Sequence, residues 1–250
     1  MNKQDQYIHI EIKRQEKAST PSYWEKYKIK YRPNLNVIAV LQDLQINPIT
    51  AEGKPTSPPA WEAACLEEVC GTCSMLINGR ARQACSTIID TLEQPIKLEP
   101  FSKFPIIRDL ITDRNRMFEH LKHIKGWINV DGTYELGPGP RHSAGLALER
   151  YKLSECMTCG CCLEVCPQYG DHSPFIGPQA ISQVQLFNLH PTGSMNAEER
   201  LESVMGEGGI TDCGDAQNCV KVCPKKIPLT ESIAKVSRST TILGFKKLFR

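Results

Sequence analysis

Residues 156–167 read CMTCGCCLEVCP, and this stretch decides how the second half of the chain folds. Its cysteines follow the spacing C-x2-C-x2-C-x3-C, and Pro167 comes directly after the last of them. This spacing is typical of loops that bind 4Fe-4S clusters, and where two clusters share a domain the fourth cysteine ligates the other cluster. A partner run of cysteines is therefore expected elsewhere in the chain.

The partner run lies at residues 213–224 and reads CGDAQNCVKVCP, but Ala216 stands where its middle cysteine belongs. This run therefore offers two cysteines to its own cluster, to which the first run adds one, and three thiolates favour a 3Fe-4S cluster. The expected 3Fe-4S ligands are Cys166, Cys213 and Cys219. The expected 4Fe-4S ligands are Cys156, Cys159, Cys162 and, by the same crossing over, Cys223.

Cys161 falls out of register between these ligands. A free cysteine often behaves as a small buried hydrophobic residue. We therefore interpret Cys161 as a packing residue rather than a ligand or redox group, and expect Cys161→Ser to leave all clusters in place.

A further cysteine group at residues 65–85 reads CLEEVCGTCSMLINGRARQAC. It follows C-x4-C-x2-C with a later fourth cysteine, which is the plant-type spacing of 2Fe-2S ligands. The dipeptide NG at residues 78–79 favours a type I′ hairpin turn that folds the fourth cysteine back toward the loop. The alternative is a structural zinc site, although zinc ribbons use paired C-x2-C arms and one such arm is present here. The expected 2Fe-2S ligands are Cys65, Cys70, Cys73 and Cys85.

The segment up to residue 105 predicts a small mixed sheet with one helix. Apolar residues alternate over residues 8–12 and 27–31, as in the two strands of a hairpin. Residues 37–46 have helical apolar spacing, with Asn34 or Asn36 as the cap, and residues 96–98 offer a last strand. Three prolines end this segment, so the domains are placed at residues 1–105 and 106–250.

Beyond residue 105 the pattern changes to helices. The spacing predicts helices over residues 106–124, 144–153, 197–205 and 229–236, and an irregular loop at residues 136–141. The two cysteine runs form a diverged internal repeat. The second domain is therefore expected to be an α-helical unit that carries two clusters.

Composition and charge exclude several classes of function. The net charge is +2 and neither half is strongly basic, which argues against nucleic-acid binding. No apolar run approaches the roughly 18 residues of a membrane-spanning helix, so the chain is expected to be soluble and intracellular. In a reducing compartment, twelve cysteines indicate metal ligands or catalytic thiols before they indicate disulfides. The six histidines lie at no zinc-like spacing and no acid-base pair is recognisable, so no catalytic residue is expected.

Together the three motifs resemble those of the iron-sulfur subunits of succinate dehydrogenase and fumarate reductase, across nearly the whole chain. Residues 186–202, LFNLHPTGSMNAEERLE, resemble the branch found in Gram-positive bacteria. The resemblance implies an α+β chain with an N-terminal β-grasp 2Fe-2S ferredoxin-like domain and a C-terminal α-helical dicluster ferredoxin domain.

The resemblance also implies a role in electron transfer, respiration and the tricarboxylic acid cycle, as a subunit of respiratory complex II. Electrons would come from a flavoprotein subunit whose covalent FAD oxidises succinate, and would pass through the 2Fe-2S, 4Fe-4S and 3Fe-4S clusters to a haem-containing membrane cytochrome b subunit and quinone. The chain would lie peripherally on the cytoplasmic face of the cell membrane. The segment from Lys221 onward carries eight Lys or Arg against Glu231 alone. Near a membrane this charge would favour anionic lipid head groups, and the alternative is an ordinary solvated segment.

Two positions depart from ubiquinone-type relatives, which carry a Trp and a His beside the 3Fe-4S cysteines where this chain has Asp171 and Gly214. We therefore expect electrons to enter haem in the membrane partner first, with menaquinone as the acceptor. Cys73 is present, although some relatives replace it by Asp. The alternatives are a fumarate reductase subunit, a subunit of another flavoprotein such as a glycolate-oxidase type, a free ferredoxin-like carrier and a zinc-stabilised interaction module.

Overall fold

The computed structural model of the chain describes residues 6–129 and 141–249, and the chain divides into two compact units. Unit 1 comprises Met1–Arg114 together with Cys159–Glu164. Unit 2 comprises Asn115–Thr158 together with Val165–Arg250. The irregular loop expected at residues 136–141 lies outside the described residues except for Arg141.

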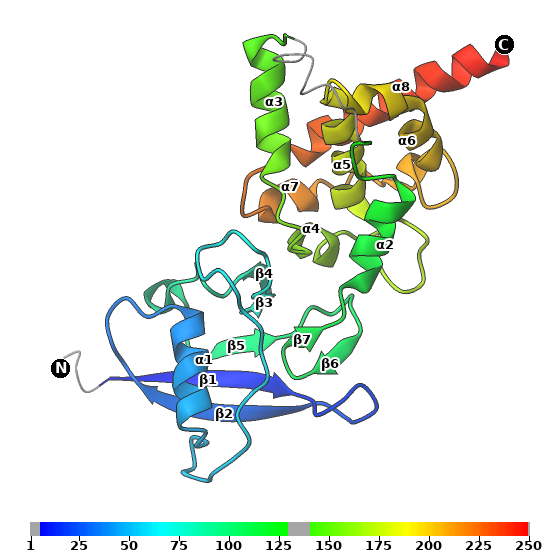
Figure 1. Ribbon diagram of the computed structural model, residues 1–250. Helices are drawn as coiled ribbons and strands as arrows, with labels where there is room; N and C mark the ends of the chain where they lie inside the picture. Colours follow the sequence, from blue (N-terminus) through cyan, green and yellow to red (C-terminus); the bar gives the residue numbers. More distant parts are fainter. Residues whose placement is uncertain (1–5, 130–140, 250) are drawn as a thin grey trace. The chain divides into compact units, whose positions relative to one another are not determined.

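Unit 1 contains a five-stranded mixed sheet in the order β2-β1-β5-β3-β4 (Figure 1). Strand β1 pairs antiparallel with β2 and parallel with β5, and β3 lies antiparallel to both β5 and β4. Helix α1 packs on this sheet, so the expected β-grasp arrangement is confirmed. The strands are β1 (Tyr7–Arg14), β2 (Tyr23–Lys30), β3 (Ser74–Ile77), β4 (Arg80–Gln83) and β5 (Ile96–Glu99), and the helix is α1 (Val37–Ile46).

The core of unit 1 follows from the alternation along β1 and the helical spacing along α1. Ile8, Ile10 and Ile12 are buried on one face of β1, as the period of two requires. Each buried side chain of this size stabilises the fold by about 1.5–3 kcal/mol. Asn36 begins α1 by accepting a hydrogen bond from the Ala39 N–H at 2.8 Å, which identifies it as the cap.

The prediction of a helix over residues 106–124 is wrong in its first half. Residues there form a short hairpin of β6 (Ile106–Arg108) and β7 (Ile111–Thr112), and only α2 (Asn115–His123) is helical. Asp109 causes the difference because it sits in the turn with φ 45° and its buried carboxylate accepts hydrogen bonds from the backbone of Gln15 and Ala60. These distant contacts override the local apolar spacing.

Unit 2 is built around α5 (Gly177–Leu189), most of which is buried. Helices α2, α3, α6 and α8 all pack against it (Figure 1). The sequence predicted α3 and α6 but not α5, and α8 continues far beyond the expected residue 236. The remaining elements are α3 (Ala144–Ser154), α4 (Cys161–Glu164, in unit 1), α6 (Ala197–Ser203), α7 (Asn218–Val222), α8 (Leu229–Leu248) and 3-10 turns at Ile89–Thr91, Gly193–Asn196 and Ile210–Asp212.

No helix in the described part of the chain combines the length and apolar character needed to cross a membrane.

Candidate metal centres

The first cysteine loop, residues 65–73, curls around its own sulfur atoms. The backbone N–H groups of Glu67, Val69 and Cys70 donate to the Sγ of Cys65 at 3.3–3.4 Å. Those of Cys65 and Thr72 donate to the Sγ of Cys70 at 3.5 Å. A loop whose N–H groups point inward at sulfur stabilises negative charge there, which is what thiolate ligands need.

The β3-β4 hairpin brings the fourth cysteine back to this loop. Asn78 and Gly79 both have positive φ, 49° and 71°, as a type I′ turn requires. The Glu68 N–H donates to the Sγ of Cys85 at 3.3 Å, and the Ala84 N–H donates to the carbonyl oxygen of Cys73 at 3.1 Å. The structure thus gathers the four cysteines expected to bind 2Fe-2S.

The pKa values of two thiols in this loop are displaced in opposite directions. Burial, and then the neighbouring Cys85 thiol, raises the pKa of Cys73 to about 12. Slight burial works to raise the pKa of Cys70 as well, but hydrogen bonds from Thr72 and Cys65 lower it to about 6. Thiolate is therefore the favoured form of Cys70 at neutral pH, whereas Cys73 needs a metal to displace its proton.

Arg114 holds the backbone of this loop, a role that no pattern in the sequence indicates. Its Nη1 and Nη2 donate to the carbonyl oxygens of Gly71 at 2.7 Å and Thr72 at 2.6 Å. Asn36 adds a second clamp because its Nδ2 donates to the carbonyl oxygen of Cys85 at 2.9 Å. The chain thus fixes the cluster loop from two distant positions.

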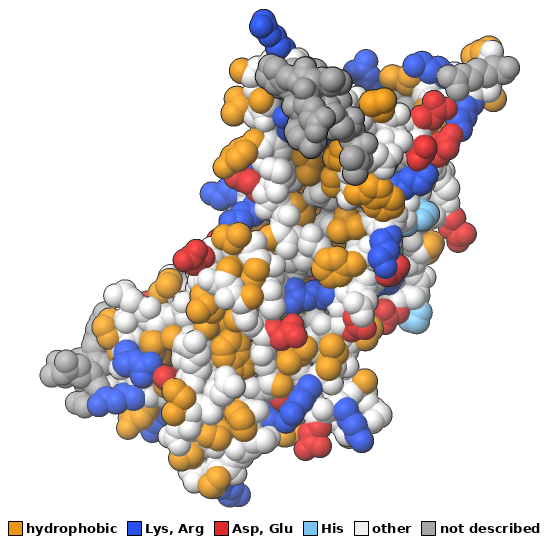
Figure 2. Space-filling view, viewed as in Figure 1, with side chains coloured by type: hydrophobic (Ala, Val, Ile, Leu, Met, Phe, Trp, Pro, Cys, Tyr) orange, Lys and Arg blue, Asp and Glu red, His pale blue; other side chains and the backbone are white. Residues whose placement is uncertain are grey.

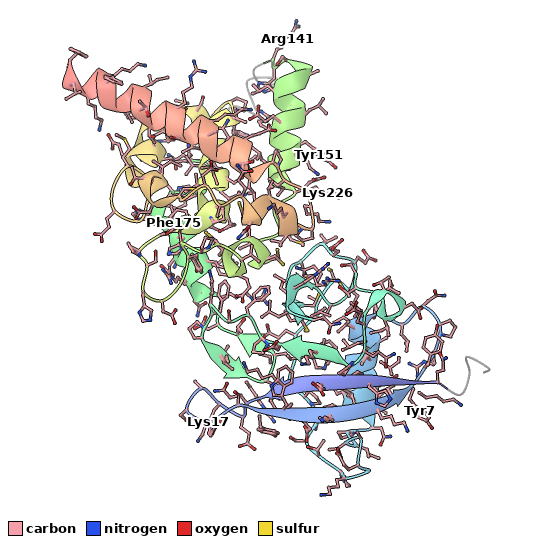
Figure 3. All side chains as sticks on the ribbon, turned by 180° about the vertical axis from the view of Figure 1, so that it is seen from behind. Tyr7, Lys17, Arg141, Tyr151, Phe175 and Lys226 are labelled. Atoms are coloured by element: carbon pink, nitrogen blue, oxygen red, sulfur yellow. The ribbon has the colours of Figure 1, made fainter. Side chains whose placement is uncertain are left out.

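In unit 2 the three cysteines expected to bind 3Fe-4S line a single cavity. Ala216 lies on its wall, and so does Phe175, a fully buried residue marked in Figure 3. Burial, with the neighbouring thiols, raises the pKa of Cys219 to about 11. The partly enclosed cavity offers three thiols, which are soft ligands, and this number suits an iron-sulfur cluster that lacks one iron. The three cysteines are Cys166, Cys213 and Cys219.

The loop around Ala216 is tightly constrained. Asp215 and Gln217, on either side of Ala216, both have positive φ, and Asn218 Nδ2 donates to the carbonyl oxygen of Val165 at 3.2 Å. A Cβ at Gly214 would lie 2.4 Å from the amide nitrogen of Gln168, so any side chain at position 214 requires Gln168 to move.

The four cysteines expected to bind 4Fe-4S are distributed over both units. Cys159 and Cys162 belong to unit 1, where α4 begins directly after Gly160. Cys156 and Cys223 belong to unit 2, where the Ile227 N–H donates to the Sγ of Cys223 at 3.4 Å. Among the described residues, no group of three or more His, Cys, Asp or Glu side chains has the arrangement that holds a single metal ion.

Comparisons with known proteins agree with the order of the motifs. Residues 9–119 match the family described as a 2Fe-2S iron-sulfur cluster binding domain, and residues 152–227 match the family described as a 4Fe-4S dicluster domain. A chain of the Sdh1 complex of Mycobacterium smegmatis in the apo form has the same fold, with a TM-score of 0.80 and 23% identity over 96% of this chain and 98% of that one.

Curated relatives extend the similarity over nearly the whole chain. The succinate dehydrogenase iron-sulfur subunit of Bacillus subtilis is 54% identical over 97% of this chain and 96% of its own length. The fumarate reductase iron-sulfur subunit of Haemophilus influenzae is 30% identical over 82% of this chain and 86% of its own length. The chain therefore belongs to the family of succinate dehydrogenase and fumarate reductase iron-sulfur subunits.

Proposed function

We propose that the chain is the electron-transfer subunit of a membrane-bound succinate dehydrogenase, a succinate:quinone oxidoreductase. The observation that carries the proposal is its 54% identity, over 97% of the chain, to a succinate dehydrogenase iron-sulfur subunit. Fumarate reductase subunits share about half that identity, 28–31%, which favours succinate oxidation over fumarate reduction. In this proposal the substrate reaction belongs to a FAD-containing flavoprotein subunit, and the acceptors are a membrane cytochrome b subunit and quinone.

The proposal assigns eleven cysteines as ligands, and the bound clusters supply one-electron transfer. The hydrogen bonds onto Cys65, Cys70 and Cys85 support the first set, and the shared cavity supports the third. The sets are Cys65, Cys70, Cys73 and Cys85 for 2Fe-2S, Cys156, Cys159, Cys162 and Cys223 for 4Fe-4S, and Cys166, Cys213 and Cys219 for 3Fe-4S.

In this proposal the chain's own residues bind the cluster, orient its thiolate ligands and shield it from water. Backbone N–H groups of residues 65–72 hold the thiolates and lower the cost of their negative charge. Arg114 keeps that backbone in place, and the burial of Cys73 and Cys85 excludes water from one side of the site. Such hydrogen bonds and burial are the means by which a protein sets the potential of a cluster.

The decisive experiment is to purify the chain with its partners from membranes and to add succinate. Electron paramagnetic resonance is expected to show a 3Fe-4S signal in the oxidised complex and reduction of the clusters by succinate. A complex whose clusters are reduced by another electron donor but not by succinate contradicts the proposal and favours another flavoprotein partner. A chain that is recovered free of partners favours the ferredoxin-like carrier.

Ala216 offers a separate test of the 3Fe-4S assignment. Ala216→Cys adds a fourth thiol to the cavity wall, so the site is expected to hold 4Fe-4S and to lose the oxidised 3Fe-4S signal. Ala216→Ser is the matched control because it adds a group of similar size that is a poor cluster ligand. An unchanged 3Fe-4S signal in Ala216→Cys, or a 4Fe-4S signal in the unchanged protein, contradicts the assignment.

The exposed face at the end of α8 supports a membrane-bound partner and a peripheral position at the cytoplasmic face. Ile242, Phe245 and Leu248 are 45%, 60% and 77% exposed there, next to Lys246 and Lys247. Figure 2 shows orange and blue side chains together at this C-terminal end, at the upper right. Apolar side chains flanked by lysines suit the junction of a membrane subunit and anionic head groups.

Phe245 tests this surface. Phe245→Glu is expected to release the subunit from washed membranes, while Phe245→Leu, which keeps an apolar side chain, is expected to stay bound. Immunoblots of the membrane and soluble fractions measure the difference. Equal retention of both variants contradicts a role for this surface in attachment.

A further inference from the structure

Residues 165–176, all of which the structure describes, contain no helix or strand, although they carry part of the lining of the cavity that contains the proposed 3Fe-4S ligands. Cys166, one of those ligands, lies near the start of this segment, and Phe175, which is fully buried, lies near its end. Between them, Asp171 and His172 are exposed. A segment without regular secondary structure is held by its individual contacts, so its place beside the cavity depends on the side chains that bind it.

Arg116, in the first turn of α2, binds the middle of this segment. Its Nη1 donates to the carbonyl oxygen of Gly170 at 2.8 Å, and its Nη2 donates to that of Ser173 at 2.6 Å. Its Cζ also lies 4.7 Å from the centre of the Tyr169 ring. A guanidinium suits this position because its planar fork can bond two acceptors and stack on a ring, whereas the ammonium of lysine is a point charge.

The residues around Arg116 keep it in place. Met117, the next residue of α2, is fully buried, and Tyr169 is 2% exposed. The ring of His120, one turn further along α2, meets the Tyr169 ring edge-on with 6.1 Å between the ring centres. Tyr169 therefore contacts two side chains of the same helix, which fixes the segment against α2 within unit 2.

Hydrogen bonds connect the points held by Arg116 to the cavity in both directions. Toward the ligand, the Tyr169 N–H donates to the carbonyl oxygen of Cys166 at 3.2 Å. Toward the cavity wall, the Phe175 N–H donates to the Oγ of Ser173 at 3.2 Å. A displacement of the middle of the segment is therefore transmitted to a proposed ligand on one side and to the cavity wall on the other.

We propose that Arg116 is a positioning residue of the 3Fe-4S site: through its two hydrogen bonds it holds residues 165–176 in place and keeps solvent away from the bound cluster. The proposal rests on the proposed function, because it takes the cavity to be the 3Fe-4S site. Without Arg116 the segment is expected to open more often. Attack through a transiently opened form follows the population of that form when opening and closing are fast.

The test is the rate at which the complex, purified from membranes, loses its oxidised 3Fe-4S signal to the iron chelator EDTA. Electron paramagnetic resonance of samples taken over time measures this rate, and the 2Fe-2S signal of a reduced portion of each sample is the internal reference. Arg116→Met removes both hydrogen bonds. One hydrogen bond from a charged donor, at the low end of its range, is worth about tenfold in an equilibrium, so the 3Fe-4S signal is expected to decay about tenfold faster. The 2Fe-2S signal is expected to decay at an unchanged rate.

Two variants separate the hydrogen bonds of Arg116 from its charge and from a general effect of the substitution. Arg116→Lys keeps the charge without the fork, so its rate is expected to lie between those of Arg116→Met and the unchanged complex. Arg238→Met is the matched control, because it makes the same substitution at an exposed arginine of α8 in the same unit. Its rate is expected to equal that of the unchanged complex.

Hydrogen exchange of the same complexes, followed by mass spectrometry, measures the opening directly. In Arg116→Met, peptides that cover residues 165–176 are expected to exchange faster, and peptides that cover α8 are expected to exchange as before. Equal acceleration in both overturns the proposal, because Arg116 would then support unit 2 as a whole. Equal 3Fe-4S decay in Arg116→Met and the unchanged complex, or full restoration by lysine, also overturns it. If Arg116→Met does not assemble, the comparison of Arg116→Lys with the unchanged complex decides in the same way.

Failure of the proposed function has a different signature. It appears already in the unchanged complex, as the absence of a 3Fe-4S signal in the oxidised form or of its reduction by succinate. In that case the cluster assignment fails before any variant is compared. A normal 3Fe-4S signal in the unchanged complex with no effect of Arg116→Met refutes the role of Arg116 alone.

Discussion

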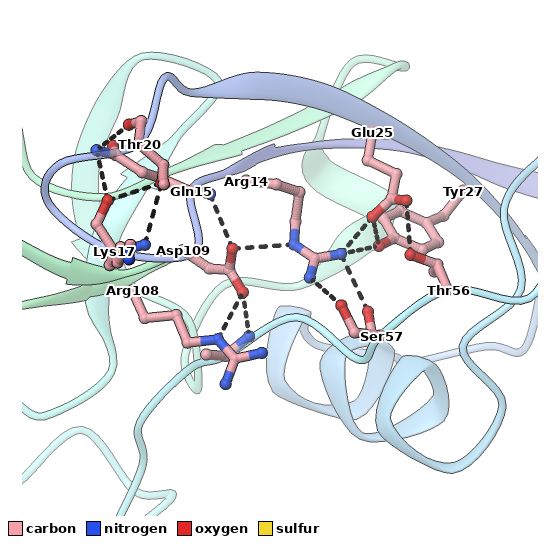
Figure 4. A network of polar contacts seen from close by, with 11 residues as sticks. Arg14, Gln15, Lys17, Thr20, Glu25, Tyr27, Thr56, Ser57, Arg108 and Asp109 are labelled. Carbon is pink, nitrogen blue, oxygen red and sulfur yellow. Dashed lines mark hydrogen bonds and ion pairs between the residues drawn. The ribbon is translucent and has the colours of Figure 1, made fainter.

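Arg14 is a buried cation within a network of polar contacts in unit 1 (Figure 4). Its Nε lies 3.0 Å from the Oδ1 of Asp109, and its Nη1 donates to Tyr27 and to the carboxylate of Glu25. Both nitrogens at its tip also donate to Ser57, in the segment that leads to the first cysteine loop. The change to make is Arg14→Met, which removes the charge and keeps a side chain of similar length.

The expected loss in the free energy of unfolding follows from the buried Asp109 carboxylate that remains after the change. Asp109 is 1% exposed, and its carboxylate would keep hydrogen bonds from the Gln15 and Ala60 N–H groups but lose its buried counter-charge. Removing one partner of a buried pair costs about 3–5 kcal/mol. Those two N–H donors place the expected loss near the lower end, about 3 kcal/mol of the free energy of unfolding.

The assay is urea unfolding of the full chain, followed by circular dichroism, with the visible absorbance of the clusters recorded in parallel. Arg32→Met is the matched control, because Arg32 pairs with Asp43 at 2.7 Å but is 54% exposed. A surface pair of this kind is worth about 0–1 kcal/mol. Equal losses in the two variants, or a loss below about 1 kcal/mol for Arg14→Met, refute the assignment of the network as a buried support.

Two further changes probe other parts of the chain. Burial and the Arg116 charge lower the pKa of His120, so the unfolded chain binds more protons than the folded chain below about pH 6.5. The free energy of unfolding is therefore expected to fall as the pH drops from 7 to 5. Urea titrations should show a smaller fall for His120→Gln, but an unchanged fall for His172→Gln, because His172 is exposed. Asn36→Ala is expected to lower the free energy of unfolding, measured in urea, by about 1 kcal/mol. Asn36→Asp should keep the helix cap and lose only the hydrogen bond to the carbonyl oxygen of Cys85. Equal losses in the two variants would contradict the capping role.

The regular elements of unit 1 were predictable because local pattern and tertiary structure agree there. The alternation at residues 8–12 and the NG turn at residues 78–79 each specify a hairpin without contacts from residues distant in the sequence. At residues 106–112 they disagree, because the buried Asp109 joins segments that are far apart in sequence. The domain ranges 1–105 and 106–250 stay a prediction, as do the ligand sets.

The cysteines of the sites were predictable from spacing, but the residues that hold them were not. Arg114 reaches the cluster loop across more than forty positions, and nothing in its own surroundings marks it. Gln83 did leave a trace, since it is a polar residue two positions after Ala81 and therefore lies on the same, inward-facing side of β4. A polar side chain at a core position of a strand indicates a buried partner, and here that partner is Cys161.

Cys161 shows why burial alone does not settle the role of a cysteine. The sequence predicted that it is buried, and it is. A packing residue needs only apolar neighbours, yet the Nε2 of Gln83 donates a hydrogen bond to the Sγ of Cys161 at 3.4 Å. A serine or alanine would fill nearly the same space, so shape does not require sulfur at this position. What distinguishes cysteine from alanine there is a sulfur atom that can accept the hydrogen bond from the buried Gln83 amide.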